Sequence, residues 1–158
     1  MPLIDQYSKT RPVFPGAHLR VIAPAGPFNS ESFELGIEWL RRRYEVSFID
    51  SIYEKDGYFA GSDKRRLDEL NEAVLDSNVD AIVCARGGFG CTRLLPGLDI
   101  SAISHSNKMI VGFSDITALH SLWANAGVRS IHAPMVAGLG RASEKIREDW
   151  VGLLENQG

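Results

Sequence analysis

The sequence predicts an α/β protein built on a parallel sheet with helices packed on both faces. Short apolar runs alternate along the chain with segments whose apolar residues recur at the helical period. Some of these runs contain almost no polar residues, which is typical of strands buried on both faces. The 158 residues contain no internal repeat or low-complexity tract, so we expect residues 1–158 to form one domain.

The first strand is expected at His18–Ala23, an apolar run that ends in the loop-forming segment Pro24–Pro27. Asn29 and Ser30 follow as candidate helix N-caps, because either side chain can accept a hydrogen bond from a free amide of the first turn. Three apolar residues at i, i+4 and i+7 then predict one buried helix face, made of Phe33, Ile37 and Leu40.

The same strand and helix pattern recurs in the middle of the chain. Glu45–Ile49 predicts a second strand, and Ser62 predicts the N-cap of a second helix. Asp80–Ala85 is almost wholly apolar and predicts a third strand that is covered on both faces. The apolar face of the second helix is expected to consist of Leu67, Leu70, Val74 and Leu75.

The last third of the chain predicts two more strands. After the loop Arg86–Gly90 and a short helical segment, Lys108–Phe113 predicts the fourth strand. A helix is expected over Asp115–Ala126 and the fifth strand over Val128–His132. Ser143 then caps a last helix, whose apolar side is expected to consist of Ile146, Trp150, Leu153 and Leu154.

Five strands that alternate with helices predict flavodoxin- or Rossmann-like layering. In such sheets, ligands bind beyond the carboxyl ends of the strands. We therefore expect a functional site in the loops that follow four of the strands, at residues 24–28, 86–90, 112–115 and 132–135.

Composition argues against several classes of partner. The 17 basic and 20 acidic residues give a net charge of -3, which offers no electrostatic footprint for nucleic acid or an anionic membrane. No apolar stretch approaches the ~20 residues that span a bilayer. The N-terminus lacks the apolar segment of a signal peptide. We expect a cytoplasmic protein in which Cys84 and Cys91 stay reduced.

The sequence offers no ligand set for a metal ion or a cofactor. His18 and His105 have no partner at metal-ligand spacing. Arg93 stands where a dinucleotide-binding fingerprint requires its third glycine, and no Gly-Lys-Ser/Thr phosphate loop is present. No metal and no cofactor are therefore expected.

Ser114 lies where the fourth predicted strand turns directly into a helix, and Gly112 leaves room for a tight bend. This is the context of a nucleophile elbow, which exposes a serine hydroxyl and directs helix N-terminal amides at a developing oxyanion. Ile116 replaces the second glycine of the G-x-S-x-G pattern, so an ordinary α/β-hydrolase is not supported. Helix capping by Ser114, with Asp115 favourable in the first turn, explains the same residues.

The loop Arg86–Gly90 contains three glycines among five residues and follows the third predicted strand. Glycine permits positive φ and lets backbone amides approach a ligand closely, so this loop can bind an oxyanion or a phosphate. A plain turn without a ligand accounts for the same composition.

The histidines offer little help with the base that a serine nucleophile normally requires. His120 follows Ser114 by six residues, a spacing that does not place both side chains on one helical face. His132 ends the fifth predicted strand at the same edge of the sheet, where a packed or hydrogen-bonded role is expected.

Three blocks, in order, resemble the LD-carboxypeptidase family of serine peptidases, which includes the microcin C immunity peptidases. They are Tyr58–Leu67 (YFAGSDKRRL), Ala85–Gly90 (ARGGFG) and Gly112–Leu119 (GFSDITAL). Ala23–Pro27 (APAGP) also resembles the family's first-strand loop. Each block alone is weak evidence, whereas three in order with sensible spacing are strong evidence.

The resemblance implies that Ser114 is the nucleophile and that the backbone amides of Asp115 and Gly88 form the oxyanion hole. The rest of the glycine loop, Arg86, Gly87 and Phe89, is implied to bind the substrate. The implied reaction is hydrolysis of an amide between an L-centre and a D-residue, such as release of terminal D-alanine from murein tetrapeptide.

The sequence departs from the family in two ways. His132–Met135 reads HAPM where the family usually has His-Gly-Pro-Met. Family members also carry a C-terminal domain that supplies the glutamate and histidine of the catalytic triad, and this domain is expected to be absent from the chain. Little or no peptidase activity is therefore expected from residues 1–158 alone.

Two other functions remain open on the sequence. A non-catalytic domain could hold a murein peptide or a nucleotide at the glycine loop and helix N-termini. A peptidase of the microcin immunity type shares the chemistry and differs in substrate. The expected partner is a small peptide, with the base supplied by the missing domain or another chain. An uncovered apolar patch would also favour association, including a homodimer.

Overall fold

The structure, a computed structural model, describes residues 10–156 and confirms the α/β architecture. Five parallel strands form one sheet in the order β2-β1-β3-β4-β5, which is the flavodoxin-like order. The strands are β1 (His18–Ile22), β2 (Glu45–Ser47), β3 (Ala81–Cys84), β4 (Met109–Gly112) and β5 (Ser130–His132).

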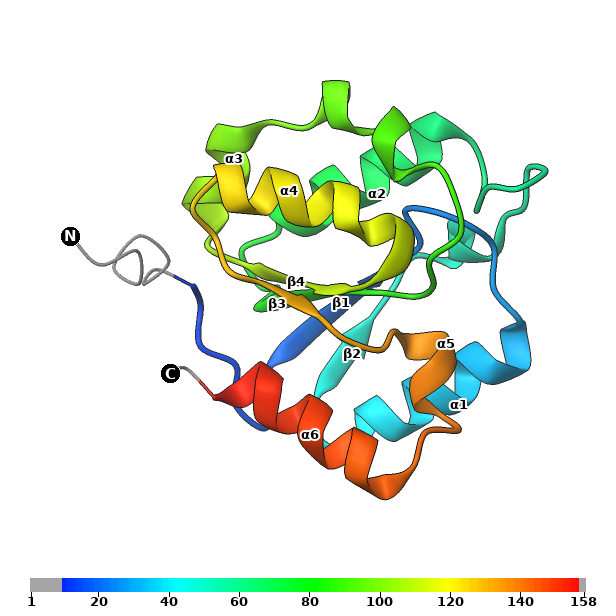
Figure 1. Cartoon of the computed structure of the whole chain (residues 1–158), viewed down its shortest axis with the longest axis vertical. Helices are drawn as coiled ribbons and strands as arrows, with labels where there is room; N and C mark the ends of the chain where they lie inside the picture. Colours follow the sequence, from blue (N-terminus) through cyan, green and yellow to red (C-terminus); the bar gives the residue numbers. More distant parts are fainter. Residues whose placement is uncertain (1–9, 157–158) are drawn as a thin grey trace.

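Helices cover both faces of the sheet, as the sequence predicts. α2, α3 and α4 lie on one face, and α1, α5 and α6 lie on the other (Figure 1). No helix within residues 10–156 is long and apolar enough to cross a membrane. The helices are α1 (Ser30–Arg41), α2 (Asp63–Leu75), α3 (Ile100–Ser106), α4 (Thr117–Asn125), α5 (Val136–Leu139) and α6 (Glu144–Glu155), and the 3-10 turns are η2 (Asp50–Tyr53), η3 (Cys91–Arg93), η4 (Leu95–Gly97) and η5 (Ser114–Ile116).

Each face of the sheet has its own hydrophobic core. In β3, Ala81 and Val83 face the core beneath α1 and α6, whereas Ile82 and Cys84 face the core beneath α2 and α4. Successive residues of a strand point to opposite faces, so a strand buried on both sides must be apolar throughout. The unalternating pattern of the central strands therefore has a direct physical cause.

Asn29, rather than Ser30, is the N-cap of α1, and the predicted caps Ser62 and Ser143 are confirmed. Asn29 Oδ1 accepts a hydrogen bond from the amide of Ser32 at 2.9 Å, and Ser62 Oγ accepts one from Arg65 at 3.1 Å. Ser143 Oγ caps α6 through Ile146 at 3.3 Å. Short polar side chains thus fix where α1, α2 and α6 begin.

All five strands are shorter than predicted. β1 ends one residue early at Ile22, and β3 and β4 each lose one residue at both ends. β2 ends at Ser47, and β5 begins at Ser130 rather than Val128. Ala23, Ala85 and Val128 lie outside the strands but are buried, so the apolar pattern reflects burial and extends beyond the strand pairing.

The buried face of α2 differs from the predicted face. Leu70 and Val74 are buried as expected, but Leu75 is 70% exposed. Arg66 and Glu69, which are not in the predicted apolar face, are buried instead. The buried face of α2 therefore includes two charged residues, each with one ion-pair partner on α2 itself and further partners in distant loops.

The predicted apolar side of α6 is also only half buried. Trp150 and Leu154 pack in the core, whereas Ile146 is 45% exposed and Leu153 is 47% exposed. Trp150 crosses Trp39 of α1 edge to face, with ring centroids 5.8 Å apart. This contact joins α6 to α1 at the C-terminal end of α1.

Candidate active site

The loops that follow β1, β3 and β4 meet at one edge of the sheet, because these strands are neighbours. The amide of Gly26 donates a hydrogen bond to the carbonyl of Gly87 at 3.0 Å. The amide of Cys91 donates to Asp115 Oδ2 at 2.8 Å. The amide of Ala133 donates to the carbonyl of Gly112 at 3.3 Å, so all four loops in which a site is expected are joined by direct contacts.

Ser114 has a backbone conformation that serine rarely adopts. Its φ is 63°, in the left-handed region, and it opens the turn η5 between β4 and α4. This conformation costs a non-glycine residue on the order of 1–2 kcal/mol, and such strain is typical of functional turns. The serine side chain caps neither η5 nor α4, so the capping interpretation is wrong. Within residues 10–156, the hydroxyl has no hydrogen-bond partner.

Two glycines make room for this turn. A Cβ at Gly87 would lie 3.0 Å from Ser114 Cβ and 3.2 Å from its Oγ, so only glycine leaves the serine free space. A Cβ at Gly112 would lie 2.9 Å from two side-chain carbons of Ile116. The bend that the sequence predicts at Gly112 therefore depends on close packing against the next turn.

Gly88 adopts a φ of +120°, and a Cβ there would lie 2.9 Å from Gly26 Cα. The glycine loop is thus more than a plain turn, because it lies directly against the loop after β1. Its amide, like the amide of Asp115, has no hydrogen-bond acceptor among residues 10–156. Two free backbone donors therefore lie on the two loops that enclose Ser114.

A buried arginine, which is not among the site residues predicted from the sequence, connects these loops. Arg66 is fully buried in α2, and its Nη1 donates to the carbonyl of Pro24 at 2.8 Å and to that of Gly90 at 3.1 Å. Its Nη2 pairs with Asp63, which also pairs with Arg93. The guanidinium therefore links the loop after β1 to the end of the glycine loop.

A second buried pair supports the loop after β1. Glu69 Oε2 accepts from the amide of Ala23 at 2.9 Å, and Arg65 Nη2 donates to the carbonyl of the same residue at 2.7 Å. Arg65 Nε also donates to Ala60 at 2.6 Å. Burial raises the pKa of Glu69, and the neighbouring Arg65 opposes that shift. Arg65, in the block Tyr58–Leu67, and Glu69, just after it, thus hold the loop after β1 in place.

The signal for this network was present in the sequence. Arg66, Leu70 and Ala73 lie at i, i+4 and i+7, so an arginine shares the apolar face of α2. A charged residue on an apolar helix face requires a buried partner. Here the partners are backbone carbonyls of distant loops.

Of the two histidines near the site, one is hydrogen-bonded to the backbone and the other is exposed. His120 Nε2 is hydrogen-bonded to the carbonyl of Gly112 at 2.8 Å. His132 is exposed, and its ring centroid lies 5.9 Å from that of Phe113 and 6.0 Å from that of His120. Neither imidazole is hydrogen-bonded to Ser114 within the described chain. Cys91 is buried, and burial raises the pKa of its thiol, so the thiol is not a competing nucleophile.

Two hollows flank the glycine loop. The first, of about 500 Å³, is mostly apolar and includes Phe113, Met135 and Ile146 in its walls. The second, of about 420 Å³, lies against Gly88 and Phe89. The predicted substrate-binding residue Arg86 lines both hollows, and Phe89 is 57% exposed beside the second.

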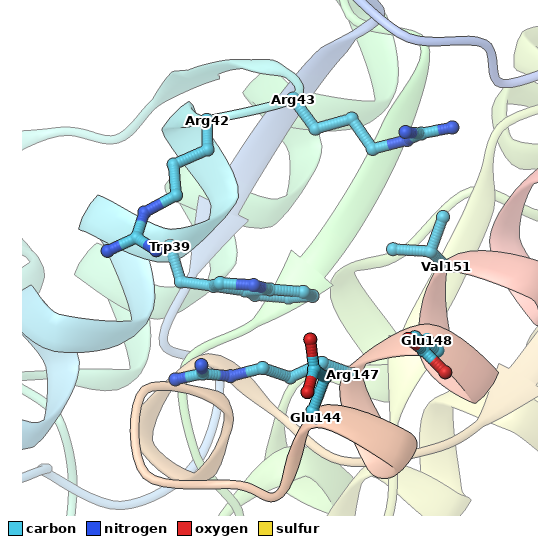
Figure 2. Close-up of a pocket in the computed structure, with 7 residues that line it drawn as sticks. All are labelled: Trp39, Arg42, Arg43, Glu144, Arg147, Glu148 and Val151. Carbon is cyan, nitrogen blue, oxygen red and sulfur yellow. The ribbon is translucent and has the colours of Figure 1, made fainter.

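A third hollow lies elsewhere, between α1 and α6, and charged side chains surround it (Figure 2). Arg42 and Arg43 line it and lie just before β2 in the chain, so it lies at the amino end of the sheet, away from Ser114. Arg43 pairs with Glu155 at 2.6 Å. Figure 2 shows Arg147 beneath Trp39, with its guanidinium carbon 5.4 Å from the ring centroid. Arg43 and Arg147 therefore already have partners. Since the hollow also lies away from Ser114, it is not the candidate site.

The family model described as the LD-carboxypeptidase N-terminal domain matches residues 19–133. The chain belongs to the LD-carboxypeptidase family. This match includes β1 to β5, the glycine loop and the Ser114 turn of this LD-carboxypeptidase domain. It confirms the resemblance that the three blocks carry.

Individual LD-carboxypeptidase relatives agree with the family match. The chain is 39% identical to a putative carboxypeptidase of Streptomyces coelicolor over 145 residues, covering 84% of this chain and 46% of the relative. It is 35% identical to the murein tetrapeptide carboxypeptidase of Pseudomonas aeruginosa over 126 residues, covering 76% and 40%.

A solved structure of the microcin C7 self-immunity protein, in complex with aspartyl sulfamoyl adenosine, matches the fold with a TM-score of 0.86. It is 26% identical, and the match covers 93% of this chain and 47% of that protein. The chain spans about half the length of the curated relatives that it matches.

Proposed function

We propose that the protein is a serine peptidase that hydrolyses an amide between an L-centre and a D-residue, such as the bond to terminal D-alanine in murein tetrapeptide. The observation that supports this most strongly is the strained Ser114, with a φ of 63° and its hydroxyl directly against Gly87. A helix cap would not need such strain. Membership of a family of LD-carboxypeptidases supports the reaction class.

In the proposed reaction, Ser114 Oγ attacks the carbonyl carbon of the scissile amide. The negative charge that develops on the carbonyl oxygen is stabilised by the backbone amides of Gly88 and Asp115, which are free to donate. Collapse of the tetrahedral intermediate releases the D-residue, whose amine takes up a proton, and leaves an ester on Ser114. Water then hydrolyses this ester. Arg86, Gly87 and Phe89 contact the peptide.

The general base is proposed to come from outside residues 10–156, since no described histidine or carboxylate is hydrogen-bonded to Ser114. Relatives about twice as long are consistent with a second domain that supplies it. A second chain, including another copy of this one, is the other source. Either way, residues 1–158 alone are expected to show little or no turnover.

The test joins residues 1–158 to the remaining part of the Streptomyces relative and measures release of D-alanine from murein tetrapeptide. Release should occur and should disappear in the Ser114→Ala chimera. A matched peptide that ends in L-alanine should not be cleaved. Release that survives Ser114→Ala would contradict the proposal, and so would turnover by residues 1–158 alone at the rate of the chimera.

The second candidate function is binding without turnover, and it is favoured because no base is hydrogen-bonded to Ser114 within residues 10–156. A binding domain should show saturable affinity for a murein peptide and should never form a covalent bond through Ser114. A third candidate is a peptidase that acts on an aminoacyl nucleotide. The complex of the microcin C7 self-immunity protein with aspartyl sulfamoyl adenosine favours it. Comparing the cleavage of both substrates by the chimera separates these peptidases.

Cys84 and Cys91 are both buried and unpaired, as expected for a protein in a reducing compartment. We therefore propose a cytoplasmic location. The small murein peptide is the expected partner.

A further inference from the structure

Arg86 lies between the end of β3 and the glycine that contacts the proposed nucleophile Ser114. It follows directly after Ala85 at the carboxyl end of β3, and it precedes Gly87, which lies against the Ser114 hydroxyl. Its Nη1 donates to the carbonyl of Pro27 at 2.7 Å. An arginine has five N–H donors, so this contact orients the guanidinium and leaves other donors available.

Unlike its neighbours, Arg86 has no carboxylate partner in the described part of the chain. At the same edge of the sheet, Glu69 pairs with Arg65, and Asp63 pairs with both Arg66 and Arg93. Among residues 10–156, no carboxylate lies within ion-pair distance of Arg86. The side chain is exposed and retains its full charge for a ligand.

Arg86 is also shared by the two hollows that flank the glycine loop, of about 500 Å³ and about 420 Å³. A peptide bound across Ser114 would place its acyl part on one side of this loop and its leaving residue on the other. Arg86 lines both hollows, and the residue after it lies against the Ser114 hydroxyl, so Arg86 is positioned next to the junction of the two parts.

We propose that Arg86 binds the free α-carboxylate of the D-residue that leaves when Ser114 attacks, an assignment that rests on the proposed function. This carboxylate belongs to the residue directly beyond the scissile amide, and consecutive Cα atoms are only about 3.8 Å apart. Guanidinium and carboxylate form paired, charge-assisted hydrogen bonds. A peptide that continues past the D-residue has a neutral amide in this place, so Arg86 restricts cleavage to the chain end.

The test compares two ligands that differ only in this group, N-acetyl-L-lysyl-D-alanine and its C-terminal amide. The protein carries Ser114→Ala, so that neither ligand is turned over. Binding is followed by NMR through the amide signals of Gly88 and Asp115. The acid should bind at least tenfold more tightly than the amide. Adding Arg86→Gln should abolish this difference, and adding Arg86→Lys should keep part of it.

Adding Arg42→Gln, which removes an exposed cation at the other end of the sheet, should leave the difference unchanged. Equal binding of acid and amide, or a difference that survives Arg86→Gln, would overturn the assignment to Arg86 while leaving the proposed function standing. If neither ligand shifts the signals of Gly88 and Asp115, the proposed function fails together with this assignment.

Discussion

The carboxylate of Asp115 accepts a hydrogen bond from the backbone amide of Cys91 at 2.8 Å. Asp115 directly follows Ser114, and Cys91 directly follows the glycine loop. One side chain therefore connects the two loops that carry the proposed oxyanion-hole amides. The geometry of that hole depends on this contact as well as on the backbone of each loop.

Asp115→Ala should lower the free energy of unfolding by about 1–3 kcal/mol, because it leaves the half-buried amide of Cys91 without a partner. Asp115→Asn keeps an acceptor oxygen and should cost less. Urea denaturation of the two variants measures the difference. Wild-type stability of Asp115→Ala would show that the contact does not hold the loops together.

Gly87→Ala should disturb the proposed nucleophile Ser114 more than it disturbs the fold, since the new methyl group would lie 3.2 Å from Ser114 Oγ. We expect D-alanine release by the chimera to fall at least tenfold. The matched control is Gly152→Ala in α6, where a Cβ meets no atom within 4 Å. That variant should gain about 0.5–1 kcal/mol of stability, because alanine suits a helix better, and its rate should not change.

Arg66→Met should cost about 3–5 kcal/mol of unfolding free energy, because it removes a buried charge that binds two loop carbonyls and Asp63. Arg93 shares Asp63 but is half exposed, so Arg93→Met is the control and should cost far less. Thermal and urea denaturation of both variants provide the comparison. Equal losses would mean that burial of Arg66 contributes nothing special.

The contact of Glu155 with Arg43 and Tyr44 predicts a pH dependence. The hydrogen bond from Arg43 holds the pKa of Glu155 below its ordinary value of 4.5. The carboxylate therefore stabilises the fold above pH 4.5, and this contribution is lost as the pH falls through the lowered pKa. Glu155→Gln should melt at a lower temperature than the wild type at pH 7, and the gap should close as the pH falls well below 4.5. A gap that stays constant with pH would contradict this account.

The sequence predicts most of the fold because its signals are local. Apolar runs such as Asp80–Ala85 reflect burial on both faces of the sheet, and the caps at Asn29, Ser62 and Ser143 act within one helical turn. The exact ends of the five strands could not be predicted. They depend on where the hydrogen-bonded register with a neighbouring strand stops, whereas buried residues such as Ala23 and Ala85 extend the apolar pattern beyond that point.

The site is predictable only in part, for a related reason. The glycine loop and the serine turn are visible because glycine has few substitutes where φ is positive or space is short. The burial of Arg66 and Glu69 depends on loops that meet only in the folded chain. Charged residues in a helix otherwise predict a solvated face.

The central claim is that Ser114 is a positioned nucleophile, and an alkyl fluorophosphonate tests it most directly. Attack by Ser114 Oγ on phosphorus displaces fluoride and leaves a covalent adduct that intact-mass spectrometry detects. We predict one adduct per chain, formed slowly at neutral pH without a base, mapped to Ser114 and absent from Ser114→Ala. No adduct after prolonged incubation, or an equal adduct in Ser114→Ala, would contradict the claim.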